Sequence, residues 1–152
     1  MFTERTSVGL DVHARSVAAA AIDGVTGGVV QARLTPSFEH IRSWLAERAG
    51  PVAVAYEAGP TGFGLARAAE RAGIQMQVCA PGKTPRAAAD RVKTDRKDAE
   101  LLARLLLAGQ LRAIEVPPDW LEACRHLARA RESVRGDLGR APRPPHCRPQ
   151  QR

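Results

Sequence analysis

The stretch SVGLDVHARSVAAAAIDGVTGGVVQARL, residues 7–34, decides the fold. It contains three short apolar segments, Ser7–Val12, Ser16–Asp23 and Gly28–Leu34. The residues between these segments are turn formers, and the lengths of the turns suit antiparallel hairpins. We therefore expect the chain to open with a three-stranded antiparallel meander.

Helices and strands alternate in the rest of the chain. Pro36–Ser37 opens a helix that ends at Gly50–Pro51, and the apolar run 52–57 is too short for a helix, which predicts a buried strand. Four further elements are expected: a helix at 61–72, a strand at 74–80, a helix at 94–108 and a helix from 117 to about 135. The order βββ-α-β-α-β-α is satisfied by few topologies with right-handed crossovers. It is the order of a ribonuclease-H-like α/β fold with a mixed five-stranded sheet, followed here by a C-terminal helix.

Length and composition indicate one globular domain with a tail. The chain has 152 residues, of which 44% are hydrophobic and 26% charged, and this composition excludes wholesale disorder. No apolar run approaches the roughly 18 residues of a membrane span. The three cysteines have no metal-ligand spacing. We expect a cytoplasmic protein that does not contact the membrane.

Positive charge is concentrated at the C-terminal end. The net charge is +7, and from Arg125 onward eight arginines stand against two acidic residues. From Gly136 prolines and arginines follow without hydrophobic periodicity, which is typical of disorder. We therefore divide the chain into a domain at 1–116, the start of a linking helix at 117–135 and a disordered basic tail at 136–152. Such a tail either binds phosphate backbones without reading sequence or is merely solvated.

Two acidic residues end predicted core strands. Asp11 lies in the first strand, and Glu57 ends the strand at 52–57. A desolvated carboxylate without a partner is destabilising, so each acid either caps a turn or belongs to a site. Sites in α/β sheets form at the carboxyl ends of strands, which favours the second interpretation.

Two more acids begin the helix at 94–108. At 100° per residue, Asp95 and Asp98 continue the apolar stripe that faces the sheet, whereas Arg96 and Lys97 point away. A capping role explains one acid well and two less well. Four carboxylates at one sheet edge repel one another unless a cation offsets their charge, and oxygen ligands indicate Mg²⁺ or Mn²⁺. His13 either assists this site or is a solvated turn residue.

A basic connector precedes the same helix. A phosphate backbone would arrive there, and four or five contacts would make its binding strongly salt-dependent, although a solvated loop is the alternative. The candidate nucleic-acid-binding residues are Lys83, Arg86, Arg91, Lys93, Arg96 and Lys97.

At these residues the sequence resembles the DEDD-type transposases of the insertion-sequence family numbered one hundred and ten, related to pilin-gene invertases. The resemblance covers residues 8 to about 135, and its motifs are Val8–His13, Tyr56–Gly62 and Lys93–Ala99. It implies a RuvC-like ribonuclease-H domain of a DNA recombinase. The catalytic metal ligands that it implies are Asp11, Glu57, Asp95 and Asp98. It also implies guidance by a structured bridge RNA and, for intact members, homo-oligomers.

The resemblance covers only the first half of the sequence of a family member. Members continue through a coiled-coil-like helix into a domain that carries a serine nucleophile, whereas here the predicted helix fails at Gly136 and the residues after it look like out-of-frame translation. We therefore expect a truncated or frameshifted copy or a fragment. Such a chain would be the metal-binding and DNA-binding part of a transposase, inactive alone. A non-catalytic nucleic-acid-binding remnant is the alternative.

Overall fold

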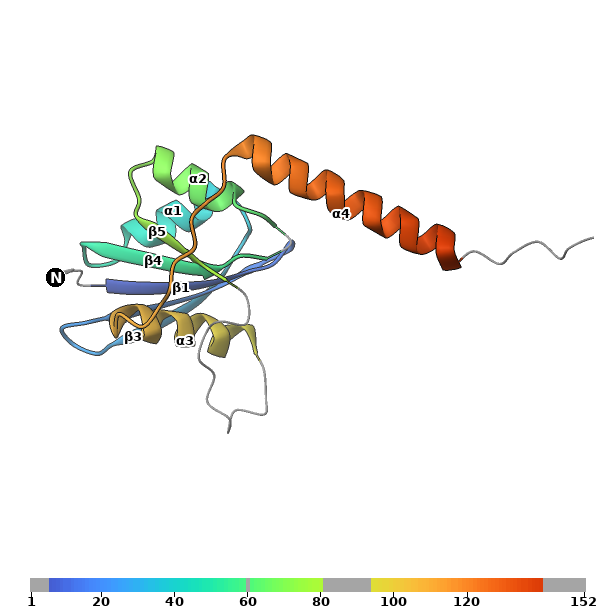
Figure 1. Ribbon diagram of the computed structural model, residues 1–152. Helices are drawn as coiled ribbons and strands as arrows, with labels where there is room; N and C mark the ends of the chain where they lie inside the picture. The colour runs from blue at the N-terminus through green and yellow to red at the C-terminus, as the bar shows by residue number, and fades with distance from the viewer. Residues whose placement is uncertain (1–5, 60, 81–93, 141–152) are drawn as a thin grey trace, which may run out of the picture. The chain divides into compact units, whose positions relative to one another are not determined.

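The computed structural model describes residues 6–59, 61–80 and 94–140, without the side chains of 139 and 140 (Figure 1). The chain divides after Val116 into two compact units. The first contains all five strands and three helices of the described residues, and the second contains one long helix. The basic residues predicted at 83–93 lie outside the described residues.

A mixed five-stranded sheet forms the centre of the first unit. Strands β1 (Thr6–Val12), β2 (Val17–Asp23) and β3 (Val29–Leu34) are the predicted antiparallel meander. β4 (Val52–Glu57) runs parallel to β1, and β5 (Met76–Cys79) runs parallel to β4. The order β3-β2-β1-β4-β5 confirms the predicted ribonuclease-H-like topology.

The helices cover both faces of the sheet. Figure 1 shows α1 (Phe38–Ala46) and α2 (Gly64–Arg71) on one side and α3 (Asp95–Leu107) on the other. The strand predicted at 74–80 begins only at Met76, because the backbone N–H of Ile74 donates to the Ala69 carbonyl and so completes the end of α2.

The larger hydrophobic core lies between the sheet and the pair α1–α2. Alternate residues of β1 and β4 fill it, among them the fully buried Leu10 and Tyr56, and Ile41 and Leu45 of α1 pack against them. Because side chains alternate along a strand, the residues between these point to the α3 side.

Small residues line the α3 side of the sheet. Ala18 and Ala20 of β2 form a buried cluster with Ala99 of α3, and Gly9 of β1 has no room for a side chain. A Cβ atom at Gly9 would lie 2.6 Å from the backbone nitrogen of Ala103. The helix therefore lies close against β1 and β2.

The second unit contains α4 (Asp119–Arg140), which is longer than predicted. The expected break at Gly136 is wrong, and residues 136–140 belong to the helix rather than to a disordered tail. An isolated glycine weakens a helix by only about 1 kcal/mol, and an ion pair of 3.2 Å between Arg135 and Glu132 lies just before it. Residues 141–152 lie outside the described residues.

Across the part of the chain that the structure describes, no helix has the length and apolarity needed to cross a membrane.

Candidate metal centre

Asp11 lies at the carboxyl end of β1, where the strand turns into β2. It pairs with Ala18 in the antiparallel register, and the backbone N–H of His13 donates to the Ser16 carbonyl at 3.0 Å to close the turn. Since Gly9 faces α3, Asp11 two residues later faces α3 as well. The sheet therefore presents this carboxylate to the start of α3.

The first turn of α3 carries the two other acids of the predicted stripe. The helix is capped by Thr94, whose side-chain oxygen accepts from the backbone N–H of Lys97 at 3.4 Å. The capping role considered for the acids therefore belongs to Thr94. Asp95 and Asp98 still favour the positive end of the helix dipole.

Three side chains converge at this edge: Asp11, His13 and Asp95. The Nε2 atom of His13 lies 3.1 Å from Oδ2 of Asp11 and 3.6 Å from Oδ1 of Asp95. One ligand atom from each residue lies within 4.8 Å of the others. Asp11 is only 19% exposed, whereas His13 and Asp95 are each 50% exposed, so the cluster is open to solvent on one side.

The electrostatics of the cluster favour a cation. Burial raises the pKa of the Asp11 carboxyl, and the negative charges of Asp95 and Asp98 raise this pKa further. The charge and hydrogen bond of His13 act in the opposite direction. A cation between the carboxylates would offset both the burial and the repulsion, and carboxylate and imidazole groups are suitable donors for a divalent ion.

Glu57 ends β4 beside Asp11. The parallel register pairs Leu10 with Tyr56, so Glu57 follows on the strand at the level of Asp11, and alternation places it on the α3 face. Burial raises the pKa of the Cys79 thiol, and the neighbouring Glu57 charge raises it further. Within the described ranges, no group of three potential ligands within 4.8 Å includes Glu57 or Asp98. Their role as ligands therefore stays a prediction.

His13 is the residue that sequence reasoning left undecided. Its position two residues after Asp11, in a tight turn, is a signal that it lies near the site, whereas the direction of its ring is not specified by the local sequence. The structure brings its ring to both Asp11 and Asp95.

Of the six predicted nucleic-acid-binding residues, the structure describes Arg96 and Lys97. Both are exposed in the first turn of α3, beside Asp95. The other four, Lys83, Arg86, Arg91 and Lys93, lie outside the described residues.

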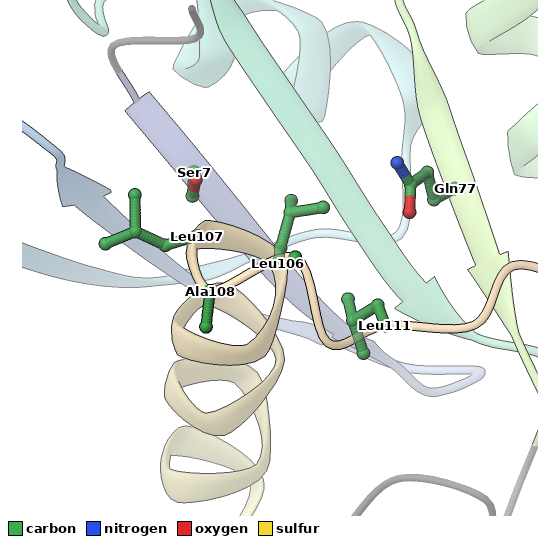
Figure 2. A pocket seen from close by; sticks show the side chains of 7 residues that line it. Ser7, Gln77, Leu106, Leu107, Ala108 and Leu111 are labelled. Atoms are coloured by element: carbon green, nitrogen blue, oxygen red, sulfur yellow. The ribbon is translucent and has the colours of Figure 1, made fainter. Parts of the chain in front are cut away.

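A cavity of about 440 Å³ lies at the other end of β1 (Figure 2). Figure 2 shows Ser7, Gln77 and residues from the C-terminal end of α3 around it. Because Ser7 is near the start of β1 and Asp11 near its end, this cavity is separate from the acidic cluster.

The fold and the cluster define a ribonuclease-H-like domain with carboxylates at the carboxyl end of its central strand. A family model for the DEDD transposases of IS110 elements, described as "Transposase", matches residues 8–143. The chain belongs to this family, which implies a divalent metal ion. The family match ends at residue 143, beyond residue 135, where the resemblance was expected to end.

Two curated relatives are similar to part of the chain. A putative transposase, y4qE, from Sinorhizobium fredii is 46% identical over 102 residues, which are 67% of this chain and 23% of the relative. The transposase for insertion sequence element IS1533 from Leptospira borgpetersenii is 43% identical over 86 residues, which are 56% of this chain and 25% of the relative. The matched region thus spans about a quarter of each relative.

Proposed function

We propose that this chain is the metal-binding and nucleic-acid-binding domain of a DNA transposase. The convergence of Asp11 and Asp95 at the carboxyl end of β1 carries the proposal. In it, four carboxylates hold Mg²⁺ or Mn²⁺ for phosphodiester chemistry: Asp11, Glu57, Asp95 and Asp98.

Divalent ions at such a site activate a nucleophile and stabilise the leaving oxygen of a phosphodiester. The protein contributes fixed positions for the carboxylates. Asp11 is held by the register of the central strand, and Asp95 is held by a capped helix that packs closely on that strand. This rigidity favours a site that is formed before the substrate arrives.

The substrate in this proposal is DNA, with a structured guide RNA as a second partner of the intact protein. Arg96 and Lys97 lie in the same helical turn as Asp95, so a phosphate drawn to the carboxylate-bound cation would pass within reach of their positive charges. The basic residues at 83–93 precede this turn in the chain and would extend the same contact.

We further propose that the 152-residue chain does not complete strand transfer by itself. The serine nearest to Asp11 in the β1–β2 turn is Ser16, and its Oγ accepts a hydrogen bond of 3.0 Å from Arg33. Ser7 lies at the opposite end of β1 and lines the cavity of Figure 2. Ser7 is therefore remote from the acidic cluster, and the hydroxyl of Ser16 contacts the guanidinium of Arg33 on β3.

The helix α4 supports homo-oligomerisation as part of the same proposal. Trp120, Leu127 and Val134 are spaced seven residues apart and are 67%, 71% and 58% exposed. Exposed apolar side chains spaced by seven residues fill one of the two heptad positions that form a coiled-coil seam.

Titration calorimetry with Mn²⁺, combined with a DNA assay, tests the proposal. We expect Mn²⁺ binding by the wild-type chain and none by Asp11→Asn, and we expect salt-dependent binding of labelled DNA without a covalent protein–DNA adduct on a denaturing gel. DNA binding without Mn²⁺ binding would instead identify a non-catalytic nucleic-acid-binding remnant. A protease-sensitive adduct would show that this chain is a complete enzyme.

A further inference from the structure

His13 is held at the acidic cluster by its own backbone. The N–H of His13 donates to the Ser16 carbonyl at 3.0 Å, which fixes the residue at the first position of the β1–β2 turn. From there the ring extends toward α3, and its Nε2 atom lies 3.1 Å from Asp11 and 3.6 Å from Asp95. The imidazole therefore contacts carboxylates from two different elements.

These distances match those between ligands of one ion. With bonds of about 2.1 Å in octahedral geometry, adjacent ligand atoms lie about 3 Å apart. A hydrogen bond to Asp11 alone would account for the shorter distance. An ion pair of protonated His13 with both carboxylates would account for both distances without a metal, and the experiments below separate it from shared metal ligation.

A nitrogen ligand changes which ion a carboxylate site prefers. Mg²⁺ takes oxygen ligands almost exclusively, whereas imidazole is a good ligand for transition-metal ions. We propose that His13 is a ligand of the ion held by Asp11 and Asp95, and that it biases this site toward Mn²⁺ over Mg²⁺. The inference rests on the proposed metal-binding function and adds to it the identity of one ligand and the metal preference.

Pulsed electron paramagnetic resonance of bound Mn²⁺ tests the ligand directly. The 152-residue chain loaded with Mn²⁺ should show nitrogen coupling, and His13→Gln should lose it. His40→Gln is the matched control, because His40 lies in α1 and its ring contacts Thr35 rather than the cluster. This control should retain the coupling.

Calorimetry with Mn²⁺ and Mg²⁺ tests the preference. Because even the outer-shell partners of a metal site alter affinity by about tenfold or more, we expect His13→Gln to lower the ratio of Mn²⁺ to Mg²⁺ affinity by at least about tenfold. His13→Asp restores a ligand but makes it an oxygen, so it should bind Mg²⁺ at least as well as the wild type while the Mn²⁺ preference disappears.

The possible failures are distinguishable. If Mn²⁺ binds without nitrogen coupling, or if His13→Gln leaves the affinity ratio unchanged, the inference about His13 is overturned and the carboxylate site remains. If the wild-type chain binds neither ion, both the inference and the proposed metal site are overturned. Circular dichroism of each variant checks that the half-exposed position tolerates the change.

Discussion

Gly9 of β1 packs against Ala99 of α3 with no space for a side chain between them. A Cβ atom at Gly9 would collide with the Ala99 carbonyl oxygen and would lie 2.8 Å from the Cβ of Leu102. Asp11 lies two residues after Gly9, and Asp95 lies four residues, about one turn, before Ala99. The close approach of helix and strand is therefore what brings the two carboxylates together.

Gly9→Ala is expected to separate this helix from the strand. Overpacking of this kind costs about 1–3 kcal/mol, so the variant should unfold at a lower urea concentration and bind Mn²⁺ more weakly. Gly64→Ala is a suitable control, because a Cβ atom there has no neighbour within 4 Å. If Gly9→Ala matched the wild type in both measurements, the helix would not depend on this contact for its position.

Asp11→Asn is expected to stabilise the metal-free protein at neutral pH. Burial and two acidic neighbours raise the pKa of Asp11 in the folded state above its ordinary value of 3.8, so the folded protein binds more protons than the unfolded chain between these two values. Stability therefore falls as pH rises through this range. In EDTA at pH 7, Asp11→Asn should have a higher melting temperature than the wild type. This difference in melting temperature should shrink as the pH falls toward 3.8.

Adding Mn²⁺ to the same thermal melts should make the wild type more stable than Asp11→Asn. Saturating Mn²⁺ should raise the melting temperature of the wild type and leave Asp11→Asn unchanged, because a ligand stabilises only the state that binds it. A variant that is less stable than the wild type in EDTA at pH 7 would identify Asp11 as a structural, hydrogen-bonded acid.

The first turn of α3 allows a test of the DNA contact. Arg96→Gln combined with Lys97→Gln should weaken the binding of double-stranded DNA, and the slope of log affinity against log salt should fall by about two, one for each lost phosphate contact. Arg71→Gln removes an exposed charge from α2, on the other side of the sheet, and should leave the slope unchanged. Equal slopes for all three proteins would place the DNA elsewhere.

Much of the fold could be predicted because local patterns and tertiary packing agree. The strand 52–57 was predicted with its observed bounds, since an apolar run bounded by Pro51 and Gly59 allows few alternatives. The end of α4 could not be predicted in this way. Gly136 suggested a break, whereas the helix continues through Gly136 and Gly139 to Arg140.

The acidic residues of the site could be predicted from the sequence, whereas the contacts of His13 and Thr94 could not. Strand ends and helix periodicity indicated Asp11 and Asp95, which the structure brings together. The contact of His13 with Asp95 depends on the turn that directs the His13 ring toward the start of α3, 82 positions further along the chain. No local sequence pattern specifies that direction. The capping role of Thr94 was also missed, although threonine is a favoured N-cap residue.

Leu127→Glu is expected to weaken self-association of the chain. Leu127 is 71% exposed and lies midway between Trp120 and Val134 in the seven-residue repeat of α4, so a second copy would bury it. Burying a leucine side chain is worth about 2 kcal/mol, and the loss of one from each of two helices should raise the dissociation constant by at least about a hundredfold in sedimentation equilibrium. Arg129→Glu, two residues away and off the repeat, should leave the constant within a few-fold of the wild type. A wild-type chain that stays monomeric at the highest concentration, or equal constants for the wild type and Leu127→Glu, would show that this stripe is not an interface between copies.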